Sequence, residues 1–201
     1  MNYLAHLHLA DHSEDALLGA LLGDFVVGAD LSSWAPEVQR EIRLHRHIDS
    51  YTDAHPQVLA LKALFPQGQR RFAGIALDVY FDHLLARDWA EHSSQPLEAF
   101  SQRVYALLLR RLSELPPRLQ RIAPLMASGD WLGSYRQRAS VDRALSRMAA
   151  RLSGGGVGLV ALLPGLTAHA TRIEVGFRAF FPDLQREATH ARRRLQGSGS
   201  P

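Results

Sequence analysis

The pattern of apolar and polar residues indicates helices along most of the chain. In FAGIALDVYFDHLLARDW at 72–89, apolar residues cover nearly every direction around a helix axis, so we expect a helix buried on all sides. Prolines suited to a first turn, and Ser13 as an N-cap, mark other helix starts. The predicted helices span 13–28, 36–52, 56–65, 69–91, 96–115, 116–127, 141–152, 167–181 and 184–195, the last two separated by Pro182.

A few segments depart from this pattern. NYLAHLHLA, near the start, alternates, so we predict an extended segment with His6 and His8 on one side. A helix would instead set these two side chains about 200° apart. The glycine-rich stretch 153–158 is predicted to be a flexible link, and 196–201 a disordered tail. We therefore predict an all-α fold, a single-domain helical bundle over 1–195.

The composition fits one globular domain of ordinary size, with 201 residues of which 46% are hydrophobic. There is no cysteine, which excludes disulfides, thiolate metal sites and cysteine nucleophiles and fits a reducing cytoplasm. The sequence has neither a run of about 18 apolar residues nor a signal-peptide pattern. We therefore expect a cytoplasmic protein that does not span a membrane.

The positive charge of the chain is carried almost entirely by arginine. The formal net charge is +3, and Lys62 is the only lysine. Arginine suits bidentate contact with phosphate or carboxylate groups. Two interpretations stay open, namely a solvated surface with biased codon usage, or an acidic or phosphorylated partner. Because the arginines are scattered along the sequence, we expect no nucleic-acid partner.

The apolar helix at 69–91 carries three polar residues in its middle. Asp78 and Asp82 are four positions apart and share one face, and His83 lies about 100° further round. Each buried carboxylate costs several kcal/mol to desolvate unless it is protonated or paired with a cation. A structural salt bridge with an arginine is the simpler explanation for one Asp. For all three residues together we favour a metal or catalytic site.

A second cluster lies in LHRHIDSYTD, where His45, Asp49 and Asp53 follow one another at four-residue intervals on one helical face. A His and an Asp one turn apart can reach the same metal, or the Asp can orient the His. Asp24 is another acid with apolar neighbours in the sequence. His6 and His8 could form a pair of metal ligands or contact the substrate.

Oxygen and imidazole ligands without thiolate favour Mg²⁺, Mn²⁺ or an iron-like ion over structural zinc. Such ions activate water and hold phosphate oxygens during hydrolysis. A serine-triad enzyme is disfavoured, because no Gly-x-Ser-x-Gly motif occurs.

Five motifs in order resemble those of the acyl carrier protein phosphodiesterases, also called holo-acyl-carrier-protein hydrolases. They are MNYLAHLHLA, LLGDFVVG, LHRHIDSYTD, LDVYFDHLLARDW and the late FFP, and the resemblance covers about residues 1–185. It implies an all-helical fold similar to the HD-type metal phosphohydrolases. It also implies removal of the 4'-phosphopantetheine arm from the serine of holo-acyl carrier protein, with Mn²⁺ or Mg²⁺ as cofactor and Fe²⁺ as a further candidate.

The resemblance supports Asp24, His45, Asp49, Asp78, Asp82 and His83 as site residues. Around them it favours the motif positions Asn2, His6, His8, Arg46, Arg87 and Trp89. The order at 82–83 is Asp-His, the reverse of the HD signature.

We assign these residues provisional roles. The metal ligands are predicted to be Asp24, His45, Asp82 and His83. The predicted catalytic residues are Asp49, Asp78, Arg46, His6 and His8. The predicted partner is the acidic carrier protein, docked by exposed arginines such as Arg70, Arg71, Arg110 and Arg111.

Two other functions stay open at this point. An HD-like phosphohydrolase could act on nucleotides, which a substrate panel would reveal. A non-enzymatic helical adaptor could bind an acidic protein through its arginines, and it would need neither a divalent metal nor Asp82.

Overall fold

The computed structural model describes residues 1–152 and 156–197, and these are helical with no β-strand among them, which confirms the all-α prediction. The α-helices are α1 (Tyr3–Leu9), α2 (Glu14–Leu22), α3 (Pro36–Ala54), α4 (Pro56–Lys62), α5 (Arg70–Arg87), α6 (Leu97–Arg110), α7 (Pro117–Ser128), α8 (Trp131–Ser134), α9 (Arg138–Ala149), α10 (Gly156–Val160), α11 (Leu163–Ala168) and α12 (Ala170–Gly197). Short 3₁₀ segments are η1 (Gln67–Gln69), η2 (Trp89–Glu91) and η3 (Leu112–Glu114).

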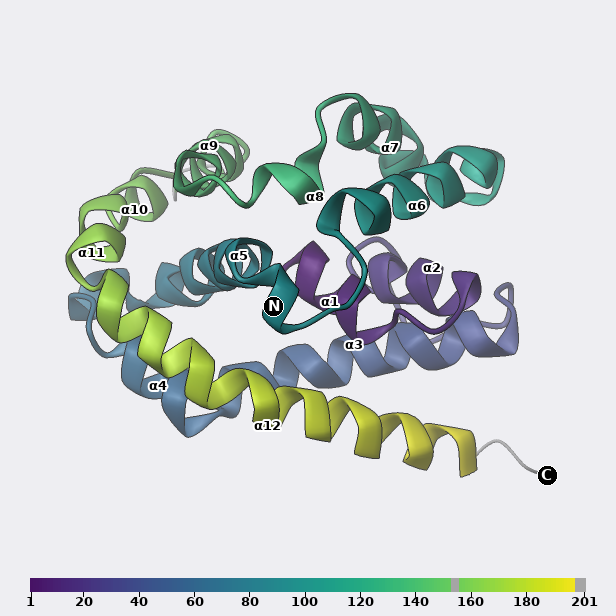
Figure 1. Cartoon of the computed structure of the whole chain (residues 1–201), viewed down its shortest axis with the longest axis horizontal. Helices are drawn as coiled ribbons and strands as arrows, with labels where there is room; N and C mark the ends of the chain where they lie inside the picture. The colour runs from purple at the N-terminus through teal and green to yellow at the C-terminus, as the bar shows by residue number, and fades with distance from the viewer. Residues whose placement is uncertain (153–155, 198–201) are drawn as a thin grey trace.

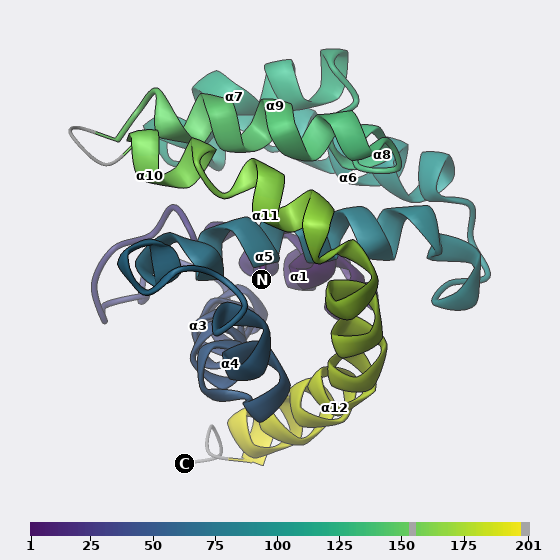
Figure 2. The same cartoon turned by 90° about the vertical axis from the view of Figure 1, so that its left-hand side faces the viewer.

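Helix α5 runs through the middle of the molecule. Seen from the side, α6 to α11 form one layer above it, and α3, α4 and α12 lie below it (Figure 2). Every residue from Val79 to Ala86 is buried, so this part of α5 is covered on all sides, whereas Ile75 nearer its start is 38% exposed. The prediction of a helix buried on every side is therefore confirmed for the second half of α5.

Helix α1 lies beside α5, close to α2 and α3 (Figure 1). Helices α2 and α3 pack closely because Gly19 faces α3 without a side chain. A Cβ atom on Gly19 would lie 2.6 Å from the carbonyl oxygen of Val38 and 2.7 Å from Cβ of Glu41. This close crossing brings the second half of α3 against the end of α2, where the candidate site forms.

The beginning of the chain is helical and not extended, so that prediction was wrong. Leu4, Ala5 and Leu7 are buried on one side of α1, which the alternating pattern did not reveal. The backbone N–H groups of Leu4 and Ala5, free at a helix start, donate to a carboxylate from α5. Contacts with a distant helix therefore decide the conformation of this segment.

The two helices predicted on either side of Pro182 form one helix, α12. Proline removes one backbone hydrogen bond from a helix interior and costs about 3 kcal/mol there. Phe180, Phe181 and Leu184 are all buried, so the apolar face continues past the proline and offsets that cost. Elsewhere the side chain of Ser13 accepts the N–H of Ala16 at 3.0 Å, which confirms its prediction as an N-cap.

Several predicted boundaries shift. Helix α2 ends at Leu22 and not near 28, and 156–158 open α10 in place of a flexible link. Gln196 and Gly197, expected in a disordered tail, end α12. Residues 153–155 and 198–201, which complete the predicted link and tail, lie outside the described residues.

Candidate active site

Two imidazoles and a carboxylate meet where α1, the end of α2 and α3 come together. The rings of His6 and His45 stack with their centroids 3.7 Å apart and an interplanar angle of 15°. His6 Nε2 lies 3.0 Å from Asp49 Oδ1, and His45 Nε2 lies 3.2 Å from Asp49 Oδ2. One ligand atom from each of the three residues falls within 4.8 Å of the others, so the cluster could hold a metal ion.

A backbone carbonyl fixes the orientation of the His45 ring. Nδ1 of His45 lies 2.6 Å from the carbonyl oxygen of Ala20, which can only accept, so Nδ1 carries the proton and donates it. Nε2 is thereby turned toward Asp49 and lies 3.7 Å from Oδ1 of Asp24. A hydrogen bond from the far ring nitrogen to a carbonyl is the usual support of a metal-binding histidine.

Gly23, in the LLGD motif, makes room for this ring. A Cβ atom at Gly23 would overlap the ring carbons of His45. The backbone of Gly23 is right-handed helical, with φ −51°, so conformational freedom is not the reason for glycine here. The sequence reading did not assign Gly23 a role.

The charges of the cluster depend on one another. Burial alone would lower the pKa of His45, but the facing carboxylates of Asp24 and Asp49 outweigh it and raise the pKa to about 9. Burial, together with the neighbouring His45, lowers the pKa of His6 to about 4. Burial also acts to raise the pKa of Asp49, yet hydrogen bonds from His45 and His6 hold it well below its usual range. Asp49 is therefore an anion beside two imidazoles.

A cavity of about 170 Å³ beside this cluster is lined by acidic, basic and aromatic side chains. Among its lining residues are Tyr3, Asp24, Asp78 and Arg118. The α-amino group of Met1 lies 3.1 Å from Oδ1 of Asp78 and 3.1 Å from Oδ1 of Asp49. Burial raises the pKa of Asp78 despite that neighbouring cation. The cavity thus holds Asp24 and Asp78, and two of its lining residues, Met1 and Asp24, contact the cluster around Asp49.

Arg118, on α7, lines the cavity and was not predicted from the sequence. Its guanidinium lies over the ring of Phe25, 5.2 Å from the centroid, at the edge of the cavity. Within residues 1–152 and 156–197 no carboxylate is paired with it, so its charge is available to a ligand. PPRLQRIAPLMA gives no local signal for this role, because only the fold brings α7 near Asp24.

Asp82, predicted as a metal ligand, lies apart from the cluster and is completely buried. Its Oδ2 accepts the N–H of Leu4 at 2.8 Å and its Oδ1 accepts the N–H of Ala5 at 3.0 Å. It therefore caps the start of α1 from α5. Burial raises the pKa of Asp82 to about 7.

His83 also lies apart from the cluster. Its Nδ1 donates to the carbonyl oxygen of Tyr135 at 2.7 Å, and burial lowers its pKa. Metal binding by Asp82 or His83 stays a prediction. Of the four predicted metal ligands, the structure brings only Asp24 and His45 together.

Two predicted catalytic residues point elsewhere. Arg46 donates to the carbonyl oxygens of Val26 at 2.7 Å and Gly28 at 2.8 Å, and these bonds stabilise the loop after α2. His8 lies on the other side of α1 from His6, where its Nε2 donates to the carbonyl oxygen of His92 at 3.1 Å. Neither contact belongs to the cavity.

The remaining motif residues make structural contacts. Asp53 pairs with Lys62 at 2.6 Å, and Arg87 pairs with Asp88 at 2.6 Å. The indole N–H of Trp89 donates to the carbonyl oxygen of Gln95. The amide of Asn2 donates to the hydroxyl of Tyr135, and Asn2 also lines the cavity.

Comparison with known proteins adds to this geometry. A family profile described as Acyl carrier protein phosphodiesterase matches residues 1–184. A protein of that name from Serratia proteamaculans (strain 568) is 38% identical over 193 residues, covering 94% of this chain and 97% of its own. Another from Shigella boydii serotype 18 (strain CDC 3083-94 / BS512) is 38% identical over 194 residues, covering 94% of this chain and 98% of its own. No solved structure matches.

Within the described part of the chain, no single helix is long and apolar enough to cross a bilayer. By length and composition alone, only Gly156–Ala168 taken together with Ala170–Gly197, a pair bent by 88°, would pass.

Proposed function

Because the chain belongs to the acyl carrier protein phosphodiesterase family, we propose that it hydrolyses the bond between the serine of holo-acyl carrier protein and 4'-phosphopantetheine. The products are apo-acyl carrier protein and free 4'-phosphopantetheine. The observation that carries this proposal is the cluster of His6, His45 and Asp49 beside a cavity that also contains Asp78 and Arg118. Phosphodiester hydrolysis needs an activated water, charge stabilisation at phosphorus and a proton for the leaving oxygen.

The donor set fits a divalent cation. Asp49, His45 and His6 would hold it, with Asp24 close to the same nitrogen of His45. The α-amino group of Met1 already places a positive charge between Asp49 and Asp78, which supports a preference for a cation in this position. When bound, such a cation supplies a more acidic water and neutralises phosphate charge. Two imidazoles with one carboxylate fit Mn²⁺ or Fe²⁺ better than Mg²⁺, which prefers oxygen ligands.

The protein's own side chains would do the rest. Arg118 can donate from its guanidinium to nonbridging phosphate oxygens, because no carboxylate of the described chain competes for it. Burial raises the pKa of the Asp78 carboxyl, which is the direction that a general acid needs. In that role its protonated form would donate to the serine oxygen as the phosphorus–oxygen bond breaks. The Ala20 carbonyl keeps Nε2 of His45 turned toward Asp49 throughout.

The test is to incubate the purified chain with holo-acyl carrier protein and Mn²⁺ and to follow loss of the arm by mass spectrometry. Asp49→Asn should reduce release about hundredfold or more, because it removes the charge that both imidazoles face. Asp53→Asn is the matched control, since Asp53 lies on the same helix but pairs with Lys62 on the surface. If the metal-loaded, folded wild type leaves the arm in place, the proposal fails. Turnover of nucleotides without apo-carrier formation would replace it with a nucleotide phosphohydrolase.

A further inference from the structure

A second groove adjoins the candidate active site and carries a row of arginines. Arg143, Arg147 and Arg151 line it together with Trp131. It shares two lining residues, Tyr3 and Met148, with the cavity that contains Asp78. A ligand lying along the arginine row would therefore end at the cavity where the reaction is proposed.

The row follows from the helical repeat of α9. Residues four apart on an α-helix are separated by about 6 Å along the axis and rotated by only about 40°, so the side chains stay on one side. Val141 and Leu145 face the core with no exposed area, whereas Arg143 and Arg147 are exposed. Arg151 continues the row in the turn after α9.

No carboxylate of the described residues neutralises these arginines, whereas about half of the other arginines are paired with one. Arg143 donates to the hydroxyl of Ser140 at 2.6 Å, and neither Arg147 nor Arg151 has a hydrogen bond or ion pair to any described residue. Arginines that do pair with a carboxylate include Arg87, Arg103, Arg110, Arg111, Arg136, Arg138, Arg178, Arg186, Arg192 and Arg194.

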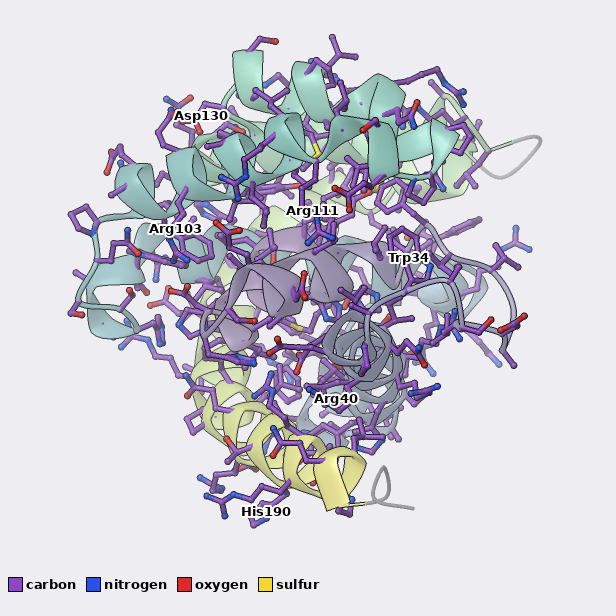
Figure 3. All side chains as sticks on the ribbon, turned by 90° about the vertical axis from the view of Figure 1, so that its right-hand side faces the viewer. Trp34, Arg40, Arg103, Arg111, Asp130 and His190 are labelled. Atoms are coloured by element: carbon purple, nitrogen blue, oxygen red, sulfur yellow. The ribbon has the colours of Figure 1, made fainter. Side chains whose placement is uncertain are left out.

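This census revises which arginines are available for docking. Arg111 lies between α6 and α2 (Figure 3) and pairs with Asp15 and Glu114, and its neighbour Arg110 pairs with Glu14. Arg70 donates to backbone carbonyls of its own segment, and Arg71 lies over the ring of Phe72, so both keep their charge, but neither lines the groove. The row on α9 keeps its positive charge and also lies beside the cavity.

We propose that the row formed by Arg143, Arg147 and Arg151 docks an acidic helical face of the carrier protein substrate, and this rests on the proposed function. Carboxylates three or four residues apart on a partner helix would match the spacing of the row. A nucleic acid suits the groove less well, because three arginines would neutralise only three phosphates of a continuous backbone.

The test compares two double charge reversals. Arg147→Glu/Arg151→Glu removes the row, and Arg40→Glu/Arg193→Glu makes the same change in net charge elsewhere. Arg40 and His190, which precedes Arg193 on α12, lie toward the opposite end of the molecule from Asp130 and the α7–α9 layer (Figure 3). Neither Arg40 nor Arg193 has an ion pair with a described residue. Circular dichroism serves as the control that both variants are folded.

Two readouts follow. Steady-state release of the arm should show KM about tenfold higher for Arg147→Glu/Arg151→Glu, with kcat changed less than about twofold and a weaker dependence on salt between about 50 and 300 mM. Fluorescence anisotropy of labelled holo-carrier protein, measured with EDTA so that no turnover occurs, should show the same loss of affinity. The second double variant should match the wild type in both.

Equal KM, affinity and salt dependence for the row variant and the wild type would overturn the docking proposal while leaving the proposed function intact. If the wild type binds holo-carrier protein through the row but never releases the arm, docking stands and the proposed reaction fails. Loss of duplex DNA binding in the row variant, with carrier binding unchanged, would also overturn the proposal in favour of a nucleic-acid partner.

Discussion

Replacing Asp82 with alanine tests whether this buried acid serves the fold or the metal. The substitution leaves the N–H groups of Leu4 and Ala5 without the carboxylate that accepts them at 2.8 and 3.0 Å. A buried, unsatisfied donor costs about 1–3 kcal/mol, and loss of a helix cap costs about 0.5–2 kcal/mol. We expect a loss of about 3 kcal/mol in the free energy of unfolding. The loss is smaller than the sum of these terms, because the variant no longer has to desolvate a buried carboxyl group.

For a chain of this size, 3 kcal/mol corresponds to a fall in Tm of about 6–12 °C. Urea and thermal unfolding followed by circular dichroism measure the loss, and titration calorimetry of the folded variant measures Mn²⁺ affinity. We expect stability to fall and metal affinity to change little. Asp53→Ala, which removes an exposed carboxylate paired with Lys62, should cost less than about 1 kcal/mol. Unchanged stability with abolished Mn²⁺ binding would refute this reasoning and make Asp82 a ligand.

Three further predictions concern the site and its pH dependence. Gly23→Ala should displace the ring of His45 and weaken Mn²⁺ binding by about tenfold, measured by titration calorimetry. Gly68→Ala is the control, because a Cβ atom there meets open space. Equal Mn²⁺ affinities of the two variants would contradict the steric argument. Arg118→Ala should lower kcat/KM for arm release by about tenfold to hundredfold, because a charge-assisted hydrogen bond to phosphate is lost. Arg118→Lys should recover part of this activity. An unchanged kcat/KM in Arg118→Ala would show that Arg118 does not belong to the site. Burial raises the pKa of Asp82 from 3.8 to about 7, so its ionisation disfavours the folded state. The contribution of Asp82 to stability is therefore complete below about pH 4 and declines as the pH rises toward 7. Over this range the urea midpoint of the wild type should fall relative to that of Asp82→Asn. Parallel plots of urea midpoint against pH for the two proteins would argue against a raised pKa of Asp82.

The helical pattern and the five motifs were enough to predict the fold class and the family. They also pointed to Asp78, an acid in an apolar helix, and to His45 and Asp49, which share one helical face. The structure places His45 and Asp49 together with His6, and the α-amino group of Met1 lies between Asp49 and Asp78. The same argument recognised Asp82 as a buried acid that requires a partner. It could not tell a cation from a pair of backbone N–H groups, since α1 lies more than seventy residues earlier in the sequence.

Other parts of the site depend on contacts that no local pattern encodes. Gly23 matters because a ring from another helix fills the space beside it. Arg118 and the row on α9 look like ordinary surface arginines until the fold places them around Tyr3. The sequence showed an excess of arginine, and only the ion pairs of the structure show which charges remain unneutralised.

The capping of α1 by α5 also bears on how the site is assembled during synthesis. α1 has 7 residues, too few to hold a helix alone in water. His6 therefore reaches its place only after α5 has emerged and folded against it. A nascent chain that ends before Asp82 has His45 and Asp49 but no fixed third member of the cluster. Capture of a cation by this cluster would then be a late event that reports completed folding, and it would favour the folded chain by mass action.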